Sequence, residues 1–442
     1  MRLSTKEIAN FYIGTLERCP QSEKCLMRCL DSLPDTLNET YERMLKSIWE
    51  PELAQHMFKV LCCAMRPLTV EEVLDSTSVT GTTTLSFDTK SKLLSPDAIQ
   101  DVCPGFIEIR PQKLWTSQDD CIDSRTVHLA HFSVQEFLES DWIQQRQGVM
   151  CFAVAPPKSH AYMTRVSLTF LLEQKMLKEQ GPPGLIISRF PFLDYAAHHW
   201  PDHFELIGTN YPPLDQALRL FDRQNRPFGR WLELYNPDGP RAPPSSPIYY
   251  ASLLGLDQIL LKLLDVSPSA LPRKLNERTG YHQSALGAAF IGATFNKNRL
   301  STLYILIGNG ADLHASIRYG YNYTPLCAAL VDLNDLEIAQ LLLNKGADIN
   351  KQAYLSKPMF HAALEKSEVD KSKLVSFFIQ NGANMNIKDG RGRTALMSTI
   401  EAGNLESLQL LLSNGVDIVV PRPLQHNRKR ASRQARKDRS TA

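Results

Sequence analysis

The segment 324–350 contains three short stretches, TPLCAA at 324–329, EIAQLLL at 337–343 and KGADIN at 345–350. Similar stretches recur through the C-terminal half of the chain at intervals of 34 to 40 residues. Copies of the first stretch are SPIYYA at 246–251, SALGAA at 284–289, PMFHAA at 358–363 and TALM at 394–397. Four of the five units close alike, with GAD at 310–312, GAD at 346–348, GAN at 382–384 and GVD at 415–417. A period of this length predicts a stack of small repeated units.

The residue types in this unit predict a pair of helices. Thr324 can cap a helix through its hydroxyl group, and Pro325 suits the first helical position because its missing N–H has no partner there. Leu326 supplies a core side chain, and Gly346 can take the left-handed conformation that ends the second helix. Asp348 suits the turn that follows. The pattern resembles the ankyrin repeat, which implies about five stacked helix pairs in an α-solenoid.

Length and composition are typical of a globular protein. The chain has 442 residues, which corresponds to about three ordinary domains. It is 43% hydrophobic and 22% charged, and its 49 basic and 47 acidic side chains leave a net charge of +2. The apolar stretches are much shorter than the ~20 residues of a membrane helix, and the N-terminus lacks the apolar core of a secretion signal. We therefore expect an intracellular protein without a membrane span, cytoplasmic rather than nuclear.

The nine cysteines indicate free thiols. No Cys-x-x-Cys pair occurs, and Cys62 and Cys63 lie in an apolar run that reads as helix. Disulfide frameworks and zinc ribbons show regular paired spacing instead. We expect most of these thiols to be reduced and buried.

The N-terminal half contains no repeat and predicts a small mixed unit. Two β-rich runs, 106–109 and 126–129, are separated by the polar segment 112–125, which we expect to be a hairpin loop. Three helix starts flank them and carry capping boxes, at Thr36 with Glu39, Thr69 with Glu72 and Ser133 with Glu136. Helix, helix, hairpin, helix is the order of a winged-helix-like module, over about 50–140. Helical patterns over 160–221 and a segment rich in Pro and Gly at 236–244 follow.

Four stretches of this half are similar to one protein family: LPDTLNETYERML at 33–45, RPLTVEE at 66–72, HFSVQEFL at 131–138 and PFLDYAAHHW at 191–200. Together with the repeats, they resemble the C-terminal part of fungal-type NACHT proteins, members of the STAND class of signalling NTPases. The winged helix of that family is named after a GPI inositol-deacylase. The resemblance implies the downstream half of a signal-transduction NTPase whose repeats sense a ligand or partner.

The sequence lacks the motifs of the two enzyme classes that this resemblance involves, a P-loop NTPase and a serine-type deacylase. It contains no phosphate-binding loop of the form Gly-x-x-x-x-Gly-Lys-Ser/Thr and no Gly-x-Ser-x-Gly nucleophile elbow. Relative to the family, both ends look shortened, because no polar capping repeat follows Asp417 either. We expect no catalytic residue, no cofactor site and no enzymatic activity.

Two histidine clusters are the candidates for a metal site. His128 and His131 would point to opposite faces of a strand, so they would not converge on one ion. His199 and His203 are four residues apart, but Pro201 argues against a regular helix between them. We expect structural roles for both clusters and no bound metal.

Nucleic-acid binding has one candidate segment, the C-terminal tail. The position of a recognition helix, 133–142, carries three acidic residues and no Lys or Arg, which is opposite to what phosphate contact requires. Residues 422–442 carry eight basic side chains and one acidic one, a net charge of +7. This tail is either a solvated, disordered terminus or a nuclear-localisation or RNA-contacting segment. We favour the first reading, so nucleic-acid binding is a third hypothesis.

The favoured functional surface lies in the loop between the second and third repeats. This loop carries Arg318, Tyr319, Tyr321 and Tyr323, and Tyr and Arg are enriched at binding hot spots. The alternative is that the rings pack back on the preceding helix pair. We expect a non-catalytic scaffold or sensor that binds a protein partner. The rival hypothesis is the regulatory half of a signalling NTPase whose P-loop domain lies outside this chain.

The expected domain organisation follows from these patterns. The fold class is mainly α, with a small α/β module, a helical connector and an ankyrin-repeat solenoid. The expected segments are a helical segment at 1–48, a winged-helix-like domain at 49–145, a helical connector at 146–235, a linker at 236–245, ankyrin repeats at 246–420 and a basic disordered tail at 421–442.

Overall fold

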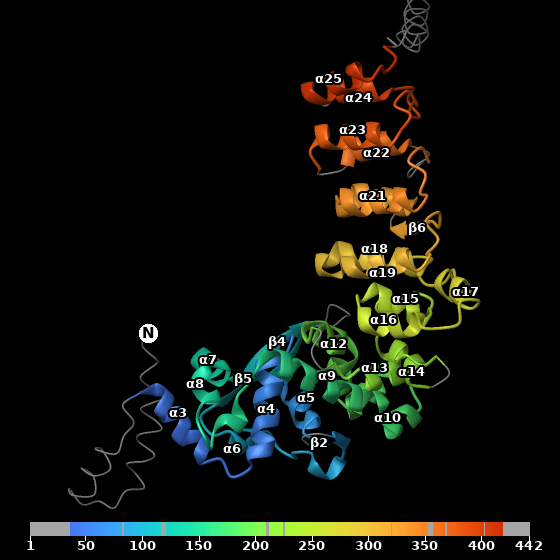
Figure 1. Ribbon diagram of the computed structural model, residues 1–442. Coiled ribbons are helices and arrows are strands. Elements are labelled where there is room, and N and C mark those ends of the chain that lie inside the picture. Colours follow the sequence, from blue (N-terminus) through green and yellow to red (C-terminus); the bar gives the residue numbers. More distant parts are fainter. Residues whose placement is uncertain are drawn as a thin grey trace, which may run out of the picture. The chain divides into compact units, whose positions relative to one another are not determined.

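The computed structural model describes residues 36–81, 84–115, 121–208, 212–223, 226–319, 321–351, 357–366, 369–401 and 403–418. The chain divides into two compact units, 1–241 and 242–442 (Figure 1). The first is a small α/β module followed by a helical region, and the second is a stack of helix pairs. The expected fold class, mainly helical with a winged-helix module and an α-solenoid, is confirmed. Within the described ranges, no helix is long and apolar enough to cross a membrane.

The first unit begins with helices whose ends are capped by side chains. Helix α3 (Leu37–Lys46) and helix α5 (Val70–Ser76) start at complete capping boxes, Thr36 with Glu39 and Thr69 with Glu72, as the sequence predicts. Between them lies α4 (Pro51–Cys63), with a proline in its first turn. Its buried face carries Met57, Phe58 and Val60, which form part of the core of this unit.

A three-stranded antiparallel sheet of order β1-β5-β4 completes the winged helix. Its strands are β1 (Leu68–Thr69), β4 (Ile107–Trp115) and β5 (Cys121–Leu129). Strands β4 and β5 pair from Ile107 with Leu129 to Trp115 with Cys121. The prediction of a loop over 112–125 is therefore wrong, because most of that segment is strand. The middle of this hairpin can be polar because the side chains of Arg110, Pro111, Lys113 and Arg125 are exposed to solvent.

Short elements connect these parts. A second small sheet pairs β2 (Val79–Thr80) with β3 (Ser86–Phe87). The remaining elements of the module are η1 (Thr89–Ser91), α6 (Pro96–Val102), α7 (Phe132–Glu139), α8 (Asp141–Gln144) and η2 (Met150–Phe152). The predicted capping box at Ser133 is wrong, because His131 caps α7: its Nδ1 accepts the Ser133 N–H at 3.2 Å. The Ser133 hydroxyl instead hydrogen-bonds Tyr41, 92 residues away.

The helical region of the first unit is built on α9 (Pro156–Leu172) packed against α12 (Phe192–Leu206). Helix α12 runs through Pro201, contrary to the expectation of a break there. A proline leaves the carbonyl four residues earlier without its helical donor. That carbonyl belongs to Ala197, and it accepts the Nε1–H of the buried Trp231 at 2.9 Å. The other helices are α10 (Gln174–Lys178), α11 (Pro183–Arg189), α13 (Leu214–Leu220) and α14 (Arg226–Leu234).

The second unit stacks five helix pairs along its described part (Figure 1). The pairs are α15 (Pro247–Leu253) with α16 (Asp257–Leu264), α18 (Ala285–Phe295) with α19 (Leu300–Gly308), α20 (Pro325–Ala328) with α21 (Leu336–Asn344), α22 (Met359–Lys366) with α23 (Lys371–Gln380), and α24 (Ala395–Glu401) with α25 (Leu405–Ser413). Three further elements are the short helix α17 (Leu271–Leu275), the 3₁₀ turn η3 (Lys297–Arg299) and the π-helical turn η4 (Ala329–Leu333), which continues α20.

The caps of the repeats are those that the sequence predicts. The Thr324 hydroxyl accepts the Cys327 N–H at 3.3 Å, and Pro325 opens α20. Gly346 has φ +99°, so it occupies the left-handed region in which only glycine is free of strain. The Gly346 and Ala347 N–H groups then bond the last carbonyls of α21, on Leu343 and Leu342.

The free thiols of the described part belong to Cys62, Cys63, Cys103, Cys151 and Cys327. Cys151 is exposed, whereas Cys63, Cys103 and Cys327 are buried. Burial raises the pKa of Cys63 to about 12, so this thiol stays protonated at neutral pH.

Candidate protein-interaction surface

The candidate surface is built on a β-hairpin between the second and third helix pairs. Strands β6 (Ile317–Tyr319) and β7 (Tyr321–Tyr323) are antiparallel, and Figure 1 shows β6 between the layers of α18/α19 and α21. The register pairs Ile317 with Tyr323 and Tyr319 with Tyr321. Ile317 is fully buried and anchors the hairpin. The sequence-predicted residues thus lie on one hairpin, and the side chains of its three tyrosines fall outside the described residues.

Arg318 is held at the surface by an aromatic ring from the preceding repeat. Its guanidinium carbon lies 4.9 Å from the ring centroid of Tyr281. A cation over a ring face is stabilised by the ring quadrupole, by about 0.5–1 kcal/mol at an exposed position. Tyr281 is 39% exposed, so this pair presents both an aromatic ring and a charge to solvent.

The backbone below this pair is tied to two earlier repeats. His282 Nδ1 lies 2.7 Å from the Arg318 carbonyl oxygen. Because a carbonyl only accepts, the proton of this bond is on Nδ1. The His282 backbone N–H donates to the hydroxyl of the buried Tyr249 at 3.1 Å. A chain of contacts from Tyr249 through His282 to the Arg318 carbonyl therefore positions the backbone of the hairpin.

Asparagine side chains connect neighbouring turns along the same stack. The Asn276 side-chain oxygen accepts the Asp312 N–H at 2.7 Å, and that of Asn350 accepts the Asn384 N–H at 2.7 Å. The Asn386 side-chain oxygen accepts the Asp417 N–H at 3.0 Å. These bonds join residues 31 to 36 positions apart, which is about one repeat. They tie three pairs of successive turns to each other.

Tyr281 is the residue of this surface that the sequence analysis missed. It lies in a turn rather than in any of the repeated stretches. Its position 37 residues before Arg318 is a usable signal, since one repeat period places the two in adjacent turns. The preceding Gly280 has φ +76°, and a Cβ there would lie 2.5 Å from the ring of Tyr249. A side chain at position 280 would therefore clash with Tyr249, so this turn requires glycine.

The first histidine cluster lies in the winged helix. His128 is on β5, where its Nε2 lies 2.8 Å from the Thr126 hydroxyl. The sequence analysis places His131 on a strand with His128. In the structure it lies instead at the N-cap of α7. Among the residues that the structure describes, no group of three or more His, Cys, Asp or Glu side chains is arranged to hold a metal ion.

The second histidine cluster is part of a buried hydrogen-bond chain. The Tyr195 hydroxyl accepts the Met65 N–H at 2.9 Å, so its own proton points to His203 Nε2 at 2.8 Å. His203 Nδ1 therefore carries a proton and donates to His160 Nδ1 at 2.9 Å. Burial first, then the neighbouring His160, lowers the pKa of His203 to about 3. The ring is neutral in the folded protein.

The geometry defines a class of protein: a winged helix followed by a helical solenoid of short repeats. Two family matches agree with this class. Residues 41–151 match the GPI inositol-deacylase winged helix domain, and residues 286–389 and 355–422 match ankyrin repeats. The chain therefore carries a winged helix domain of the GPI inositol-deacylase type followed by ankyrin repeats. The pair α15/α16 precedes the matched repeats.

Three relatives share parts of this sequence. Azaphilone pigments biosynthesis cluster protein L of Monascus ruber is 31% identical over 301 residues, which cover 64% of this chain and 61% of the relative. Putative ankyrin repeat protein FPV034 of fowlpox virus is 30% identical over 116 residues, 26% of each chain. Putative ankyrin repeat protein FPV230 of the same virus is 34% identical over 80 residues, 18% of this chain and 40% of the relative. The chain thus spans less than two thirds of the length of each of these relatives.

Proposed function

We propose that this chain is a non-catalytic scaffold or sensor that binds a protein partner through the repeat surface around the β6–β7 hairpin. Ankyrin repeats are binding modules without catalytic function, and they bind through an extended surface of stacked turns and helices. The observation that carries the proposal is the exposed Arg318, held over Tyr281 and tied through its carbonyl to His282. Side chains held in place before binding lose less entropy in a complex.

The residue types of this surface suit a protein partner. Tyr and Arg dominate binding hot spots because they combine a large apolar area with polar groups. Arg318, Tyr319, Tyr321 and Tyr323 lie on one hairpin, and Tyr281 adds a fourth aromatic ring from the neighbouring turn. We expect the partner to contact this set together.

The test compares the full chain with a variant of this surface in cells of its own organism. Arg318, Tyr319 and Tyr321 are replaced by alanine, and partners are identified by chemical crosslinking and mass spectrometry. A matched control is Lys262→Ala, an exposed cation on α16 of the same unit. We expect at least one partner to lose about tenfold or more of its crosslinks in the triple variant and none in the control. Equal partner sets for all three proteins would reject the surface.

A second candidate function is the regulatory half of a signal-transduction NTPase. The winged helix match over residues 41–151 supports it, because the same module follows the NTPase core in the NACHT proteins that this sequence resembles. Mapping the 5′ end of the transcript tests it. An in-frame Gly-x-x-x-x-Gly-Lys-Ser/Thr segment before Met1 is the expected result, and a transcript that starts translation at Met1 would contradict it.

The third candidate, nucleic-acid contact through residues 421–442, concerns a segment outside the described residues. The net charge of +7 over 422–442 is its only support. RNA binding that is insensitive to salt, or to deletion of 422–442, would contradict it.

We place the chain in the cytoplasm rather than the nucleus. Imaging of a fluorescent fusion, with and without residues 422–442, checks that assignment.

A further inference from the structure

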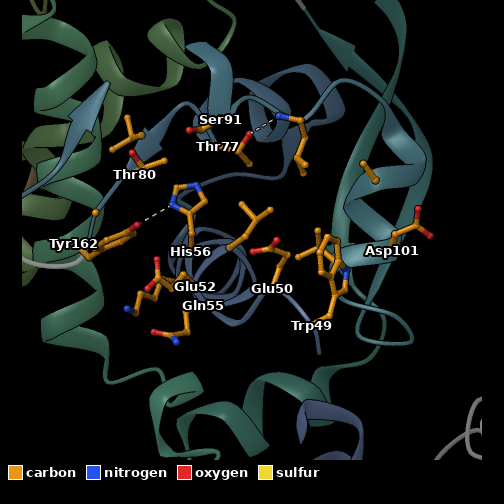
Figure 2. A pocket seen from close by; sticks show the side chains of 17 residues that line it. Trp49, Glu50, Glu52, Gln55, His56, Thr77, Thr80, Ser91, Asp101 and Tyr162 are labelled. Carbon is orange, nitrogen blue, oxygen red and sulfur yellow. Dashed lines mark hydrogen bonds between the residues drawn. The ribbon is translucent and has the colours of Figure 1, made fainter. Parts of the chain in front are cut away.

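A cavity of about 660 Å³ opens in the first unit (Figure 2). Its walls come from the start of α4, the segment 77–81 around β2, residues 91–93, helix α6 and Tyr162 of α9. This volume is in the range of pockets that hold small organic molecules, about 300–1,000 Å³. The cavity belongs to the first unit and the repeat surface to the second, and no motif in the sequence marks the cavity.

The polar groups at the base of the cavity bond one another. His56 is buried, with its Nδ1 2.8 Å from the Tyr162 hydroxyl and its Nε2 3.0 Å from the Ser76 hydroxyl. Since the Ser76 hydroxyl donates to the Val73 carbonyl, it accepts from Nε2–H, and the Tyr162 hydroxyl donates to Nδ1. The Thr77 hydroxyl is likewise satisfied by Leu74 and Leu93. A bound molecule must find its charged partners elsewhere.

The rim supplies these partners, and they are acidic. Glu50, Glu52 and Asp101 line the cavity, and none of their carboxylates has a hydrogen-bond or ion-pair partner among the described residues. In Figure 2 the Glu50 side chain points toward the middle of the cavity. The one lysine of the described lining, Lys59, lies with its Nζ 4.8 Å from the ring centroid of Tyr162. Three carboxylates against one ammonium give the opening a negative potential.

An aromatic ring and apolar walls complete the site. Trp49 stands at the rim and is 75% exposed, which is unusual for the side chain with the largest apolar area. Leu53, Val79, Leu93 and Val102 form the apolar part of the lining. A tryptophan face beside carboxylates is the combination that attracts organic cations.

We propose that this cavity binds a small organic cation, an ammonium or guanidinium group carried on an apolar body. The cationic group lies against Trp49 and Glu50, and the apolar body enters between the side chains of α4, β2 and α6. Carboxylate and phosphate ligands are repelled by the rim. The proposal gives the winged helix module a ligand of its own, independent of any partner of the repeats.

The experiment uses the full chain and three probes with the same body. 4-Phenylbutylamine is cationic, 4-phenylbutanol is neutral and 4-phenylbutyrate is anionic at pH 7. Their dissociation constants are measured by isothermal titration calorimetry and ligand-observed NMR. We expect the amine to bind at least about tenfold more tightly than the other two, with an affinity that falls as salt increases. Equal affinities, tighter binding of the anion, or no binding of the amine would overturn the proposal.

Variants locate the bound amine. Glu50→Gln combined with Asp101→Asn removes two rim charges with little change of shape, and we expect it to weaken amine binding by about fivefold or more. Trp49→Ala should weaken it similarly, and Trp49→Phe should retain most of it. The matched control Glu136→Gln alters an exposed carboxylate of the same module away from the cavity and should have no effect. An unchanged affinity in both Trp49→Ala and the double variant would overturn the site.

Discussion

Gly292 shows how a single residue sets the distance between neighbouring repeats. It lies in α18, whose residues 285–293 are all buried. A Cβ built on Gly292 would lie 2.3 Å from the carbonyl oxygen of Leu253, at the end of α15. Contacts that short do not occur, so only a hydrogen atom fits at this position. The close approach of α15 and α18 depends on it.

We expect Gly292→Ala to destabilise the repeat unit by about 1–3 kcal/mol, since backbone must shift to admit the methyl group. Gly308→Ala is the matched control, because Gly308 is also helical and a Cβ there would meet no atom within 4 Å. It should be neutral or stabilise by about 0.5 kcal/mol through reduced entropy of the unfolded chain. Urea unfolding followed by circular dichroism measures both. A Gly292→Ala protein as stable as the control would contradict the close packing.

At the scale of elements, two capping boxes with the same sequence pattern have different surroundings. The box of α3 is exposed, with both of its hydrogen bonds at 3.3 Å. In the box of α5, Glu72 is buried and accepts the Thr69 N–H at 2.8 Å. Arg66 donates to both oxygens of Glu72, at 2.9 and 2.6 Å, and to Asp194 of α12 at 3.4 Å. This second box therefore joins α5 to α12 as well as starting a helix.

We expect Glu72→Gln to cost about 2 kcal/mol of unfolding free energy, because it leaves the half-buried Arg66 without its bidentate partner. Glu39→Gln, the equivalent change in the exposed box, should cost about 0.5 kcal/mol or less. Chemical denaturation of the two variants beside the parent protein gives both values. Equal losses would mean that Arg66 adds nothing to the helix cap.

At the scale of the whole molecule, buried histidines make the stability of the first unit depend on pH. Burial and the nearby Lys59 lower the pKa of His56 to about 4, and the pKa of His203 is lowered to about 3. Both rings are neutral in the folded state at pH 5–7, whereas in the unfolded chain they take up protons near pH 6.5. The unfolded state therefore binds more protons as pH falls, and stability decreases with decreasing pH below about 6.5.

We expect the first unit to lose about 1.4 kcal/mol per buried histidine between pH 7.5 and pH 5.5. His56→Gln should remove one such contribution, so the slope of stability against pH becomes smaller even where the variant is less stable overall. His314→Gln is the control, because His314 lies outside the first unit, whose slope it should therefore leave unchanged. Urea unfolding at a series of pH values supplies the slopes. Identical slopes in the parent and His56→Gln proteins would refute the assignment.

Sequence reasoning succeeded at features in which a residue and its partners are close along the chain. The capping boxes at Thr36 and Thr69 and the left-handed Gly346 depend only on nearby backbone atoms. It failed where a distant residue supplied the partner. Ser133 bonds Tyr41 instead of capping a helix, and the carbonyl left free by Pro201 is satisfied by Trp231.

The period of the repeats, by itself, determined that this protein contains a stack of helix pairs, since each pair buries its apolar face only against the next. The similarity of four N-terminal stretches to the NACHT family predicted the winged helix. Only the tertiary structure decided which side chains of different segments meet. The cavity between α4, β2 and α6 joins residues far apart in sequence, and the repeat period places Tyr281 and Arg318 in adjacent turns without placing the guanidinium over the ring. Their positions depend on how the elements pack, and no local pattern of residues encodes that distance or direction.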